Sequence, residues 1–223
     1  MMIEHTLKQI PLFQKMPEEE LSKIKPYLRK RHYKKKEVIF LEEDTNQYMY
    51  IILEGKVKVL RNGENGKSQI MSIHKAGDFF GEMSLIDSMT EPATVVAKED
   101  CTLIIISKRD FKKLLLYREF SEQLLEILCT RLRSAWARME WLTLVNASDK
   151  VKMVLKFLAD NHGQRENGHV KIKLRLTHEE LGELAGISRE TISRELNKLK
   201  KKGSLLAAKG HILINQHSEI LEM

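Results

Sequence analysis

Cysteines are scarce in this sequence, and long apolar runs are missing. The 223 residues include two cysteines, Cys101 and Cys129, which cannot form a disulfide framework or a Cys-x-x-Cys metal site. Most iron–sulfur clusters need four thiolates, so we also exclude such a cluster. No apolar stretch approaches the roughly 20 residues that cross a bilayer, and the N-terminus has no signal-peptide pattern. We therefore expect a cytoplasmic protein with no membrane partner. Both cysteines are expected to be buried packing residues, with a redox switch as the lesser alternative.

The patterns of common catalytic sites are also missing. The sequence shows no Ser/His/Asp set, no Gly-Lys-Ser/Thr loop that grips phosphates and no cluster with metal-ligand spacing. We therefore predict that the protein is not an enzyme and holds neither a metal nor a resident cofactor.

Basic residues are in excess over acidic ones. Lys and Arg number 38 against 31 Asp and Glu, which gives a net charge of +7 and a pI near 9.3. This balance favours a polyanionic partner, although it would suit RNA or an acidic membrane as well as DNA. Apolar residues make up 42% of the chain and charged residues 31%, as in globular proteins, and the length allows two domains of unequal size.

The segment LTHEELGELAGISRETISRELNKLKKKG, residues 176–203, carries the strongest pattern. Thr177 precedes Glu180 at the spacing of a capping box, which predicts that a helix begins at His178. Gly186 can end this helix in a left-handed conformation, and Ser188 can cap a second helix. The pattern therefore predicts two helices joined by a short turn.

The second of these helices has an apolar inner face and a polar N-terminal end. In a helix that enters the major groove, the N-terminal residues face base edges, where Arg can bind guanine and Glu can accept from cytosine. Residues 188–202 include six basic and two acidic side chains, as a phosphate-binding surface requires. The predicted DNA-binding residues are Arg189, Glu190, Ser193 and Arg194 at the bases, together with Thr177, Ser188, Lys198 and Lys201.

The string SRETISRELNKLKKKG closely resembles the recognition helix of the Crp/Fnr transcription regulators, the family of the cyclic-AMP receptor protein. The resemblance implies that Arg189, Glu190 and Arg194 read bases, and Ser193 matches the serine found there in the Fnr branch. It also implies RNA polymerase as a partner. The alternative is a solvated helix pair that never touches DNA, and the Arg-Glu-Thr-x-x-Arg order counts against it.

An antiparallel barrel or roll is predicted between residues 38 and 107. Short apolar segments alternate there with period two and are separated by turn residues. The segments are VIFL, YMYIIL, KVKVL, QIMSIH, ATVVA and CTLIIIS, and Gly55, Asn62-Gly63 and Asn65-Gly66 supply turns. Residues 3–31 are predicted to form short helices, and the basic run over 29–36 is interpreted as a solvated surface before the first strand rather than a second nucleic-acid site.

Two strings, EVIFLEEDTNQYMYIILEGKVKVL and GDFFGEMSLID, resemble the cyclic-nucleotide-binding fold. Lys36 and Glu43 stand where many members carry Gly, so we expect two turns of different shape. The resemblance implies that residues 80–85 begin a phosphate-binding cassette, which an Arg-Ser/Thr-Ala triplet completes in cyclic-AMP binders. This chain has Glu91-Pro92-Ala93 instead. Because a carboxylate repels phosphate and proline lacks an amide donor, we predict that cyclic AMP is not the effector.

The identity of an effector stays open at this point. The candidate pocket residues are Gly81, Glu82, Met83, Ser84, Glu91 and Trp136. Alignment with the family puts Ala135 and Trp136 where a base-contacting Thr-Ser pair stands. Trp136 is predicted to plug the pocket as core, and stacking on an unknown small molecule is the alternative. Glu82 is interpreted as a cap on the Gly81 turn, and His74 as an ordinary strand histidine rather than a haem ligand.

A long helix is predicted from a break at Phe120-Ser121 to about Val145, after a helix capped by Ser107. Six apolar residues repeat along it at spacings of 3 and 4, which indicates a heptad seam and a parallel homodimer. The seam residues are Leu125, Leu128, Leu132, Ala135, Met139 and Leu142. A second stripe of Leu124, Ile127 and Trp136 is expected to pack on the roll, and packing within one chain is the alternative for the seam.

The C-terminal region begins at a predicted hinge, Asn146-Ala147-Ser148-Asp149, where Ser148 or Asp149 caps the next helix. A polar loop after Gly163 leads to an alternating strand over 169–176, and residues 205–214 are expected to fold back as a hairpin wing around Lys209-Gly210.

The predicted fold class is α+β: an N-terminal cyclic-nucleotide-binding-like antiparallel β-roll, a long dimerisation helix and a C-terminal winged helix-turn-helix. The predicted boundaries are 1–110 for the sensing roll, 111–146 for the dimerisation helix and hinge, and 147–223 for the DNA-binding domain. The predicted function is a homodimeric transcription regulator that binds double-stranded DNA at a near-palindromic operator. A ligand-independent regulator with its pocket filled by Trp136 is the alternative, and a haem- or redox-sensing regulator is a weaker one.

Overall fold

The computed structural model describes residues 7–62, 68–143, 146–208 and 211–222. Contacts between Cα atoms divide the chain into two compact units at the bond between Arg133 and Ser134. This division differs from the predicted boundaries at 110 and 146. The reason is that helix α5 (Arg118–Thr143) begins inside the first unit, where Phe120 and Leu124 are buried in the core.

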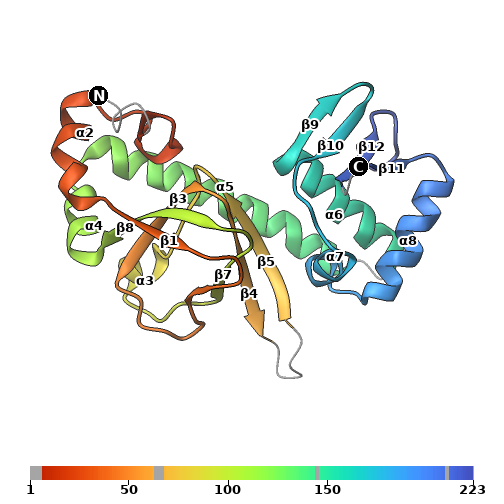
Figure 1. Ribbon diagram of the computed structural model, residues 1–223, viewed down its shortest axis with the longest axis horizontal. Helices are drawn as coiled ribbons and strands as arrows, with labels where there is room; N and C mark the ends of the chain where they lie inside the picture. The colour runs from red at the N-terminus through yellow and green to blue at the C-terminus, as the bar shows by residue number, and fades with distance from the viewer. Residues whose placement is uncertain (1–6, 63–67, 144–145, 209–210, 223) are drawn as a thin grey trace. The chain divides into compact units, whose positions relative to one another are not determined.

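The N-terminal unit is an antiparallel roll flanked by short helices, drawn from red to green in Figure 1. Its helices are η1 (Pro11–Phe13), α2 (Glu18–Ile24), η2 (Lys25–Tyr27), α3 (Met83–Asp87), α4 (Lys108–Leu114) and the first half of α5. Its strands are β1 (Arg29–Tyr33), β2 (Val38–Phe40), β3 (Tyr48–Glu54), β4 (Lys56–Asn62), β5 (Ser68–Lys75), β6 (Phe79–Phe80), β7 (Thr94–Ala97) and β8 (Cys101–Ser107).

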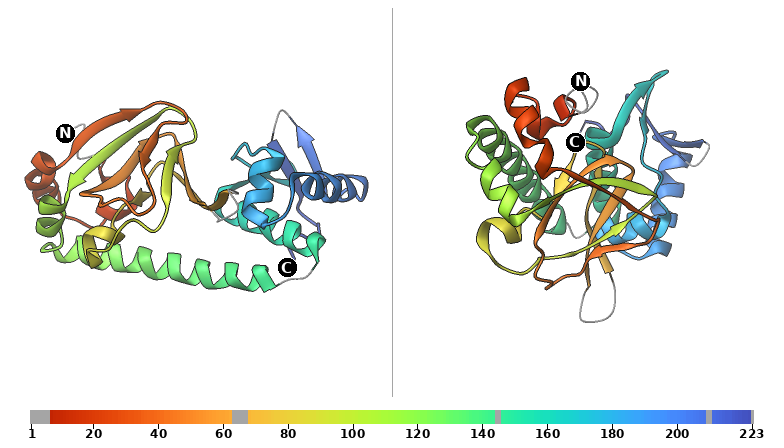
Figure 2. Two further views of the ribbon diagram at one scale, coloured as in Figure 1. Left: turned by 90° about the horizontal axis from the view of Figure 1, so that it is seen from below. Right: turned by 60° about the vertical axis from the view of Figure 1, so that its left-hand side comes forward.

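These strands pair as two four-stranded sheets with the orders β1-β8-β3-β6 and β2-β7-β4-β5. Each neighbouring pair is antiparallel, which confirms the predicted roll. Both views in Figure 2 show the first half of α5 along one side of the roll. The described residues contain no helix that is both long enough and apolar enough to cross a membrane.

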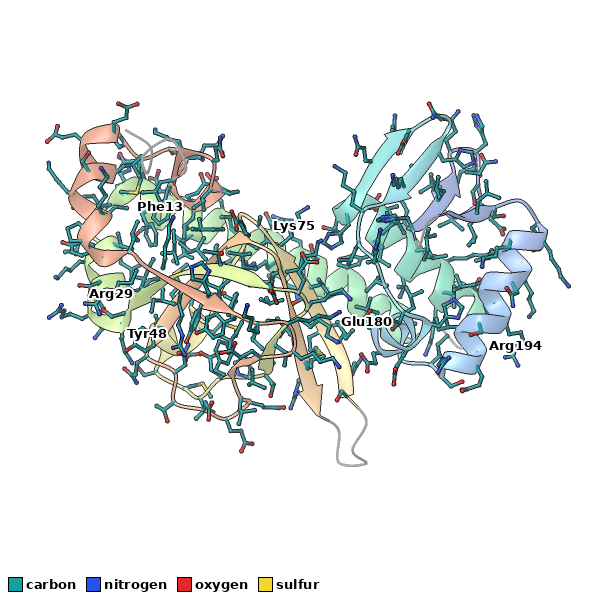
Figure 3. All side chains as sticks on the ribbon, viewed as in Figure 1. Phe13, Arg29, Tyr48, Lys75, Glu180 and Arg194 are labelled. Carbon is teal, nitrogen blue, oxygen red and sulfur yellow. The ribbon has the colours of Figure 1, made fainter. Side chains whose placement is uncertain are left out.

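Buried side chains gather in two groups within this unit. Inside the roll, the rings of Tyr50 and Phe80 stack with their centroids 5.1 Å apart, and Phe40 lies 5.7 Å from Tyr50. The second group lies among the helices and includes Phe13, labelled in Figure 3, whose ring is 5.7 Å from that of Phe120. Aromatic and aliphatic side chains therefore form the apolar core of the roll.

Two sequence predictions for this unit are wrong. Residues 29–31, which were predicted to belong to the short helices over 3–31, instead lie in strand β1, because this strand pairs along its length with β8 and tertiary pairing overrides local pattern. The predicted helix break at 120–121 lies earlier, between α4 and α5 at 115–117. Ser121 lies within α5 and donates from its hydroxyl to the Leu115 carbonyl at 2.7 Å. Ser107 caps α4 as predicted, accepting from the Asp110 amide at 3.2 Å.

Two turns keep a backbone shape that normally favours glycine. Lys36 has φ 72° and Glu43 has φ 68°, although both carry side chains. Their backbones are stabilised by long-range hydrogen bonds, since the Lys36 amide donates to Ala97 O at 2.8 Å and the Glu43 amide to Glu91 O at 2.8 Å. The expected change in turn shape is therefore not observed, and each left-handed residue costs about 1–2 kcal/mol relative to glycine.

The C-terminal unit packs three helices against a small antiparallel sheet. Its elements are α6 (Ala147–His162), β9 (Gly163–Glu166), β10 (His169–Ile172), α7 (His178–Ala185), α8 (Arg189–Lys201), β11 (Leu205–Ala208) and β12 (His211–Asn215), and the strand order is β11-β12-β10-β9. The β11–β12 pair confirms the predicted hairpin, whose turn at 209–210 lies outside the described residues.

Two details of this unit differ from the predictions. The polar loop after Gly163 is instead strand β9, because residues 163–166 pair with β10 through a short turn. The cap of α6 is Asn146 rather than Ser148 or Asp149: its Oδ1 accepts from the Ser148 amide at 2.8 Å. Asparagine is as good an N-cap as serine or aspartate, so the local pattern allowed three candidates for the cap.

Candidate nucleic-acid interface and effector site

Helices α7 and α8 form the predicted helix-turn-helix. Thr177 and Glu180 make both bonds of the capping box at the start of α7: the Glu180 amide donates to Thr177 Oγ1 at 3.1 Å, and the Thr177 amide donates to Glu180 Oε2 at 3.0 Å. Gly186 ends the helix with φ 66°, as predicted. Ser188 caps α8 by accepting from the Thr191 amide at 3.2 Å. The positions of both helix starts are therefore set by local hydrogen bonds.

Gly182 allows the turn between the helices to be tight. The Ile187 amide donates to the Gly182 carbonyl at 3.1 Å, and a Cβ atom added at Gly182 would lie 2.7 Å from Ile187 O. The turn therefore folds back onto α7 at a position where any side chain would clash with backbone. Sequence reasoning identified Gly186 and missed Gly182, which sits inside a helix pattern and gives no local turn signal.

One face of α8 is buried and the other is exposed. Ile192, Leu196 and Leu199 are buried at 1%, 3% and 3% exposure, which confirms the predicted inner face. On the outer face, Arg189, Glu190 and Arg194 are exposed. Figure 3 shows Arg194 on the side of α8 that faces away from α6. Three of the four predicted base-reading residues are thus exposed on the outer face of α8.

Ser193 differs from the other predicted base readers because its hydroxyl has partners inside the protein. It donates to the Arg189 carbonyl at 2.9 Å and lies 2.7 Å from His178 Nδ1. The second contact joins the first residue of α7 to the middle of α8. Ser193 is half-buried, so a role in orienting the two helices accompanies any contact with a base.

Other predicted DNA-binding residues are exposed around this surface. The hydroxyls of Thr177 and Ser188 both serve as helix caps, and their backbone amides lie at helix starts, where anions are favoured. Lys198 and Lys201 follow on α8, with Lys198 Nζ bound to Glu195 Oε1 at 2.8 Å. Glu195 is 4% exposed, and the hydrogen bond from Lys198 holds its pKa below the ordinary value.

Glu190 carries a negative charge on this basic surface. Its own backbone amide and the Ser188 side chain hydrogen-bond to the carboxylate and lower its pKa. The carboxylate therefore stays ionised and acts as an acceptor at the start of α8, where the helix dipole also favours an anion.

The predicted effector site lies around α3, which follows the Gly81 turn. Glu82 is 4% exposed, and its Oε1 lies 3.1 Å from Arg131 NH1 on α5. Arg131 also donates from NH2 to the Phe79 carbonyl at 2.6 Å and lies over the Phe79 ring. Burial raises the Glu82 pKa, and the neighbouring Arg131 charge opposes that rise. Glu82 stands at the N-cap of α3, but its side chain makes no hydrogen bond that caps this helix and pairs with Arg131 on α5.

Glu91 lies inside the roll rather than at its surface. It is 3% exposed, and its Oε1 accepts from Ser84 Oγ at 2.6 Å and from Asn46 Nδ2 at 2.8 Å. Tyr50 Oη lies 3.4 Å from Asn46 Oδ1. Sequence reasoning identified Glu91 and Ser84 but missed Asn46, because the loop before β3 meets α3 only in the folded chain. Met83, another candidate pocket residue, is 49% exposed.

Similarity to known proteins supports both parts of this description. The family model of the cyclic nucleotide-binding domain matches residues 30–118, and that of the Crp-like helix-turn-helix domain matches residues 151–222. The cyclic AMP receptor protein of Thermus thermophilus is 30% identical over 219 residues, which cover 97% of this chain and 98% of the relative. The chain belongs to the Crp/Fnr family of transcription regulators. It is a DNA-binding regulator of that type and not an enzyme.

Further relatives of this Crp/Fnr regulator agree with that assignment. A CRP-like cAMP-activated global transcriptional regulator of Mycobacterium tuberculosis is 25% identical over 219 residues, or 98% of each chain. The crystal structure of the Thermus thermophilus catabolite activator protein is 30% identical, covers 95% of this chain and 96% of its own, and has a TM-score of 0.55. A structure of CooA from Carboxydothermus hydrogenoformans covers 88% and 87% of the two chains at 24% identity, with a TM-score of 0.76, and shows the shared fold.

Helix α5 of this Crp/Fnr regulator presents much of the predicted seam to solvent. Leu125, Leu132 and Met139 are 61%, 51% and 63% exposed, and Ala135 is exposed as well. Leu128 is partly buried against the helical core of its own chain. The side chain of Leu142 lies outside the described residues. The alternative that the seam packs entirely within one chain is therefore wrong for Leu125, Leu132 and Met139.

The second stripe on α5 is only partly as predicted. Leu124 is 3% exposed and Ile127 packs against the same core, as predicted. Trp136 is 59% exposed, so the prediction that it plugs the pocket as core is wrong for the single chain.

The remaining cofactor and cysteine predictions concern three side chains. Cys129 is exposed, so the prediction that it is buried is wrong, whereas Cys101 is buried as predicted. The Cys101 thiol donates to the carbonyls of Lys56 and Glu99, and burial raises the pKa of this thiol. His74 Nε2 lies 3.2 Å from Ser72 Oγ, and its Nδ1 lies 3.8 Å from Asp78. Among the described residues, no group of three or more His, Cys, Asp or Glu side chains could hold a metal ion.

Proposed function

We propose that the protein is a homodimer that recognises a near-palindromic DNA sequence with the N-terminal end of α8 from each protomer. The observation that carries this proposal is the exposed row of Arg189, Glu190 and Arg194 on a helix whose opposite face is buried. An Arg side chain can bind guanine O6 and N7 bidentately, and a carboxylate can accept from the cytosine amino group. The row therefore has the chemistry to distinguish base pairs as well as to bind DNA.

The C-terminal end of α8 supplies the complementary positive charge. Lys201 and Lys202 are exposed and Lys200 is half-buried, and they follow the reading residues on the same helix. Lysines that neutralise phosphates contribute affinity independent of sequence and make binding salt-dependent. The N-terminal end of α8 therefore selects the DNA sequence, and the C-terminal end anchors the helix to the DNA backbone.

Dimerisation follows from the seam on α5. Leu125, Leu132 and Met139 recur at heptad spacing on a 26-residue helix and are exposed in the single chain. Two such helices in parallel would bury these side chains against one another. A two-fold dimer can then present one copy of α8 to each of two half-sites about 34 Å apart, which is one turn of DNA. We propose that the dimer works in the cytoplasm with RNA polymerase, as the family resemblance implies.

Cyclic AMP is not the proposed effector, although two relatives are named for it. Glu91 takes the place of the phosphate-neutralising arginine, and its carboxylate is buried at the cassette. A second anion at that place would meet electrostatic repulsion in a low-dielectric interior. A small molecule of other chemistry remains the alternative effector. The haem alternative has no support at His74, because both of its ring nitrogens have protein partners.

The test is selection of bound sequences from a random double-stranded DNA pool with the purified, full-length protein. We expect enrichment of a two-fold related motif whose half-sites are separated by one helical turn. Fluorescence anisotropy should then show that the selected sequence is bound at least about 10³-fold more tightly than mixed-sequence DNA at 150 mM salt. Equal affinity for both DNAs would contradict base reading, and a motif without two-fold symmetry would contradict the dimer.

A further inference from the structure

A cluster of buried polar side chains lies in the roll beside α3. Asn46, Tyr50, Ser84 and Glu91 are 8%, 5%, 3% and 3% exposed. They belong to separate parts of the chain, namely the loop before β3, strand β3, helix α3 and the loop between α3 and β7. A buried carboxylate is stable only where hydrogen-bond donors replace the water that it loses. Two donors of this cluster, Asn46 Nδ2 and Ser84 Oγ, point at Glu91, while Asn46 Nδ2 also donates to the Tyr48 carbonyl.

The Glu91 carboxyl group supplies an acceptor for two of these side chains, Ser84 and Asn46. The 2.6 Å distance from Ser84 Oγ lies in the range of a hydroxyl that donates to a carboxylate. Asn46 is fixed in the orientation that donates to Glu91, because its Oδ1 accepts from the Tyr48 amide at 3.1 Å. Both donors therefore converge on one oxygen and are held in place before any external molecule arrives.

The same residues connect the backbone around the cassette. The Glu91 amide donates to Asp44 O at 3.0 Å, so the loops that carry Glu91 and Asn46 are joined directly. Asn46 also packs on the turn before α3, since a Cβ atom added at Gly81 would lie 2.9 Å from Asn46 Nδ2. Through Ser84, the carboxylate then holds α3 itself. One side chain thus links two loops and a helix that a bound ligand would otherwise have to organise.

We propose that the Glu91 carboxylate is an internal ligand of the roll, occupying the donors of the anion cassette and holding α3 in place without a bound nucleotide. The carboxylate takes the role that the resemblance to nucleotide-binding rolls gives to a cyclic phosphate. Nucleotides, inorganic phosphate and small carboxylates find these donors occupied and a negative charge at the site. The consequence for DNA binding rests on the proposed function: the protein binds its operator in the absence of an anionic effector.

The first test removes the internal ligand and measures α3 directly. In Glu91→Ala, we expect the amides of residues 83–87 to exchange with deuterium at least about tenfold faster than in the wild type, because two buried hydrogen bonds are lost. Glu91→Gln keeps an acceptor oxygen at the same place and should retain most of the protection. Glu18→Ala, which removes an exposed carboxylate from α2, is the matched control and should change nothing at α3.

Chemical rescue separates an internal ligand from an ordinary structural residue. Sodium acetate at 50–100 mM, which is about the range for a weak fragment, should restore protection of residues 83–87 in Glu91→Ala and leave the wild type unchanged, with sodium chloride at equal ionic strength as the reference. The proposal would be overturned if amide exchange at residues 83–87 were the same in Glu91→Ala as in the wild type. It would also be overturned if acetate did not slow this exchange in a folded Glu91→Ala variant. If Glu91→Ala does not fold, Ser84→Ala removes only the shorter bond and must itself accelerate exchange at α3 for the proposal to stand.

The final test measures the affinity for the operator with and without added anions. Wild-type protein shown by native mass spectrometry to carry no small molecule should bind the selected operator, and 1 mM cyclic AMP or inorganic phosphate should change the affinity by less than about twofold. A tenfold increase in affinity with cyclic AMP would overturn the proposal. If the wild type recognises no operator, the proposed function fails, and hydrogen exchange with acetate rescue still decides the role of Glu91.

Discussion

Replacing Arg131 with Ala tests how the roll holds α5. The guanidinium donates to the Glu82 carboxylate at 3.1 Å and to the Phe79 carbonyl at 2.6 Å, and its Cζ lies 4.1 Å from the centre of the Phe79 ring. Removing the guanidinium leaves the Glu82 carboxylate, whose side chain is 5% exposed, without a positively charged partner. Breaking a buried pair costs about 3–5 kcal/mol. The Arg131 side chain is 29% exposed and regains rotamer freedom, so we expect a loss of about 2–3 kcal/mol near neutral pH.

The pH dependence of this loss follows from the shift at Glu82. Burial raises the folded-state pKa of Glu82 above the ordinary 4.5, and Arg131 opposes the rise. Because the folded protein binds the Glu82 proton more tightly than the unfolded chain does, this proton stabilises the fold below pH 4.5. That stabilisation is lost as the pH rises through the folded-state pKa of Glu82. Without Arg131 the folded-state pKa rises further. The destabilisation in Arg131→Ala should therefore grow as the pH increases above 4.5 and shrink as the pH falls toward it.

Urea denaturation at several pH values measures both effects. Arg133→Ala, which removes an exposed neighbouring arginine, is the control and should change the free energy of unfolding by less than about 0.5 kcal/mol. Glu82→Gln in the Arg131→Ala background removes the buried charge and should recover part of the loss and abolish its pH dependence. A loss below about 0.5 kcal/mol in Arg131→Ala, or a loss that is the same at all pH values, would refute the reasoning.

The remaining predictions concern DNA binding, assembly and the start of α8. Arg189→Ala should cost about 1–3 kcal/mol on the selected operator and relax base preference at one position per half-site, whereas equal weakening on random DNA in anisotropy titrations would rule out base reading. Leu132→Asp should give monomers in sedimentation velocity and weak operator binding, and an unchanged dimer would remove the seam from the interface. Ser188→Ala should lower the free energy of unfolding of the C-terminal unit by about 1 kcal/mol in thermal denaturation, with Ser188→Asp near the wild type, because the cap needs only an acceptor.

The helix-turn-helix was predictable because its signals are local. The capping box at Thr177, the left-handed Gly186 and the cap at Ser188 each depend on residues within four positions, so the sequence pattern contains the whole interaction. The roll was predictable from period-two alternation, which depends only on which side of a strand faces the core. Local sequence patterns did not predict strands β1 and β9, because pairing with β8 and with β10 decides their conformation.

The interior of the roll could be predicted only in part. The sequence pattern marked Glu91 as a departure from nucleotide-binding chains, but a carboxylate at that position could equally have pointed to solvent. Its burial depends on Asn46 and Ser84, which reach it from other elements. Trp136 shows the same limit in the opposite direction, because a large apolar residue on a helix face suggests core, and only the folded helix shows that its side chain is exposed.

Strand β1 has a further consequence for the isolated roll. It forms one edge of its sheet, where backbone groups on one side have no strand partner in the sheet order. The side chains of Arg29, Lys30, Arg31 and His32 along this edge are exposed, and the first three carry positive charge. Two such edges repel one another and resist the strand-to-strand association that leads to aggregates. The basic side chains of β1 therefore disfavour pairing between two such sheet edges, which leaves the proposed seam on α5 as the route of association.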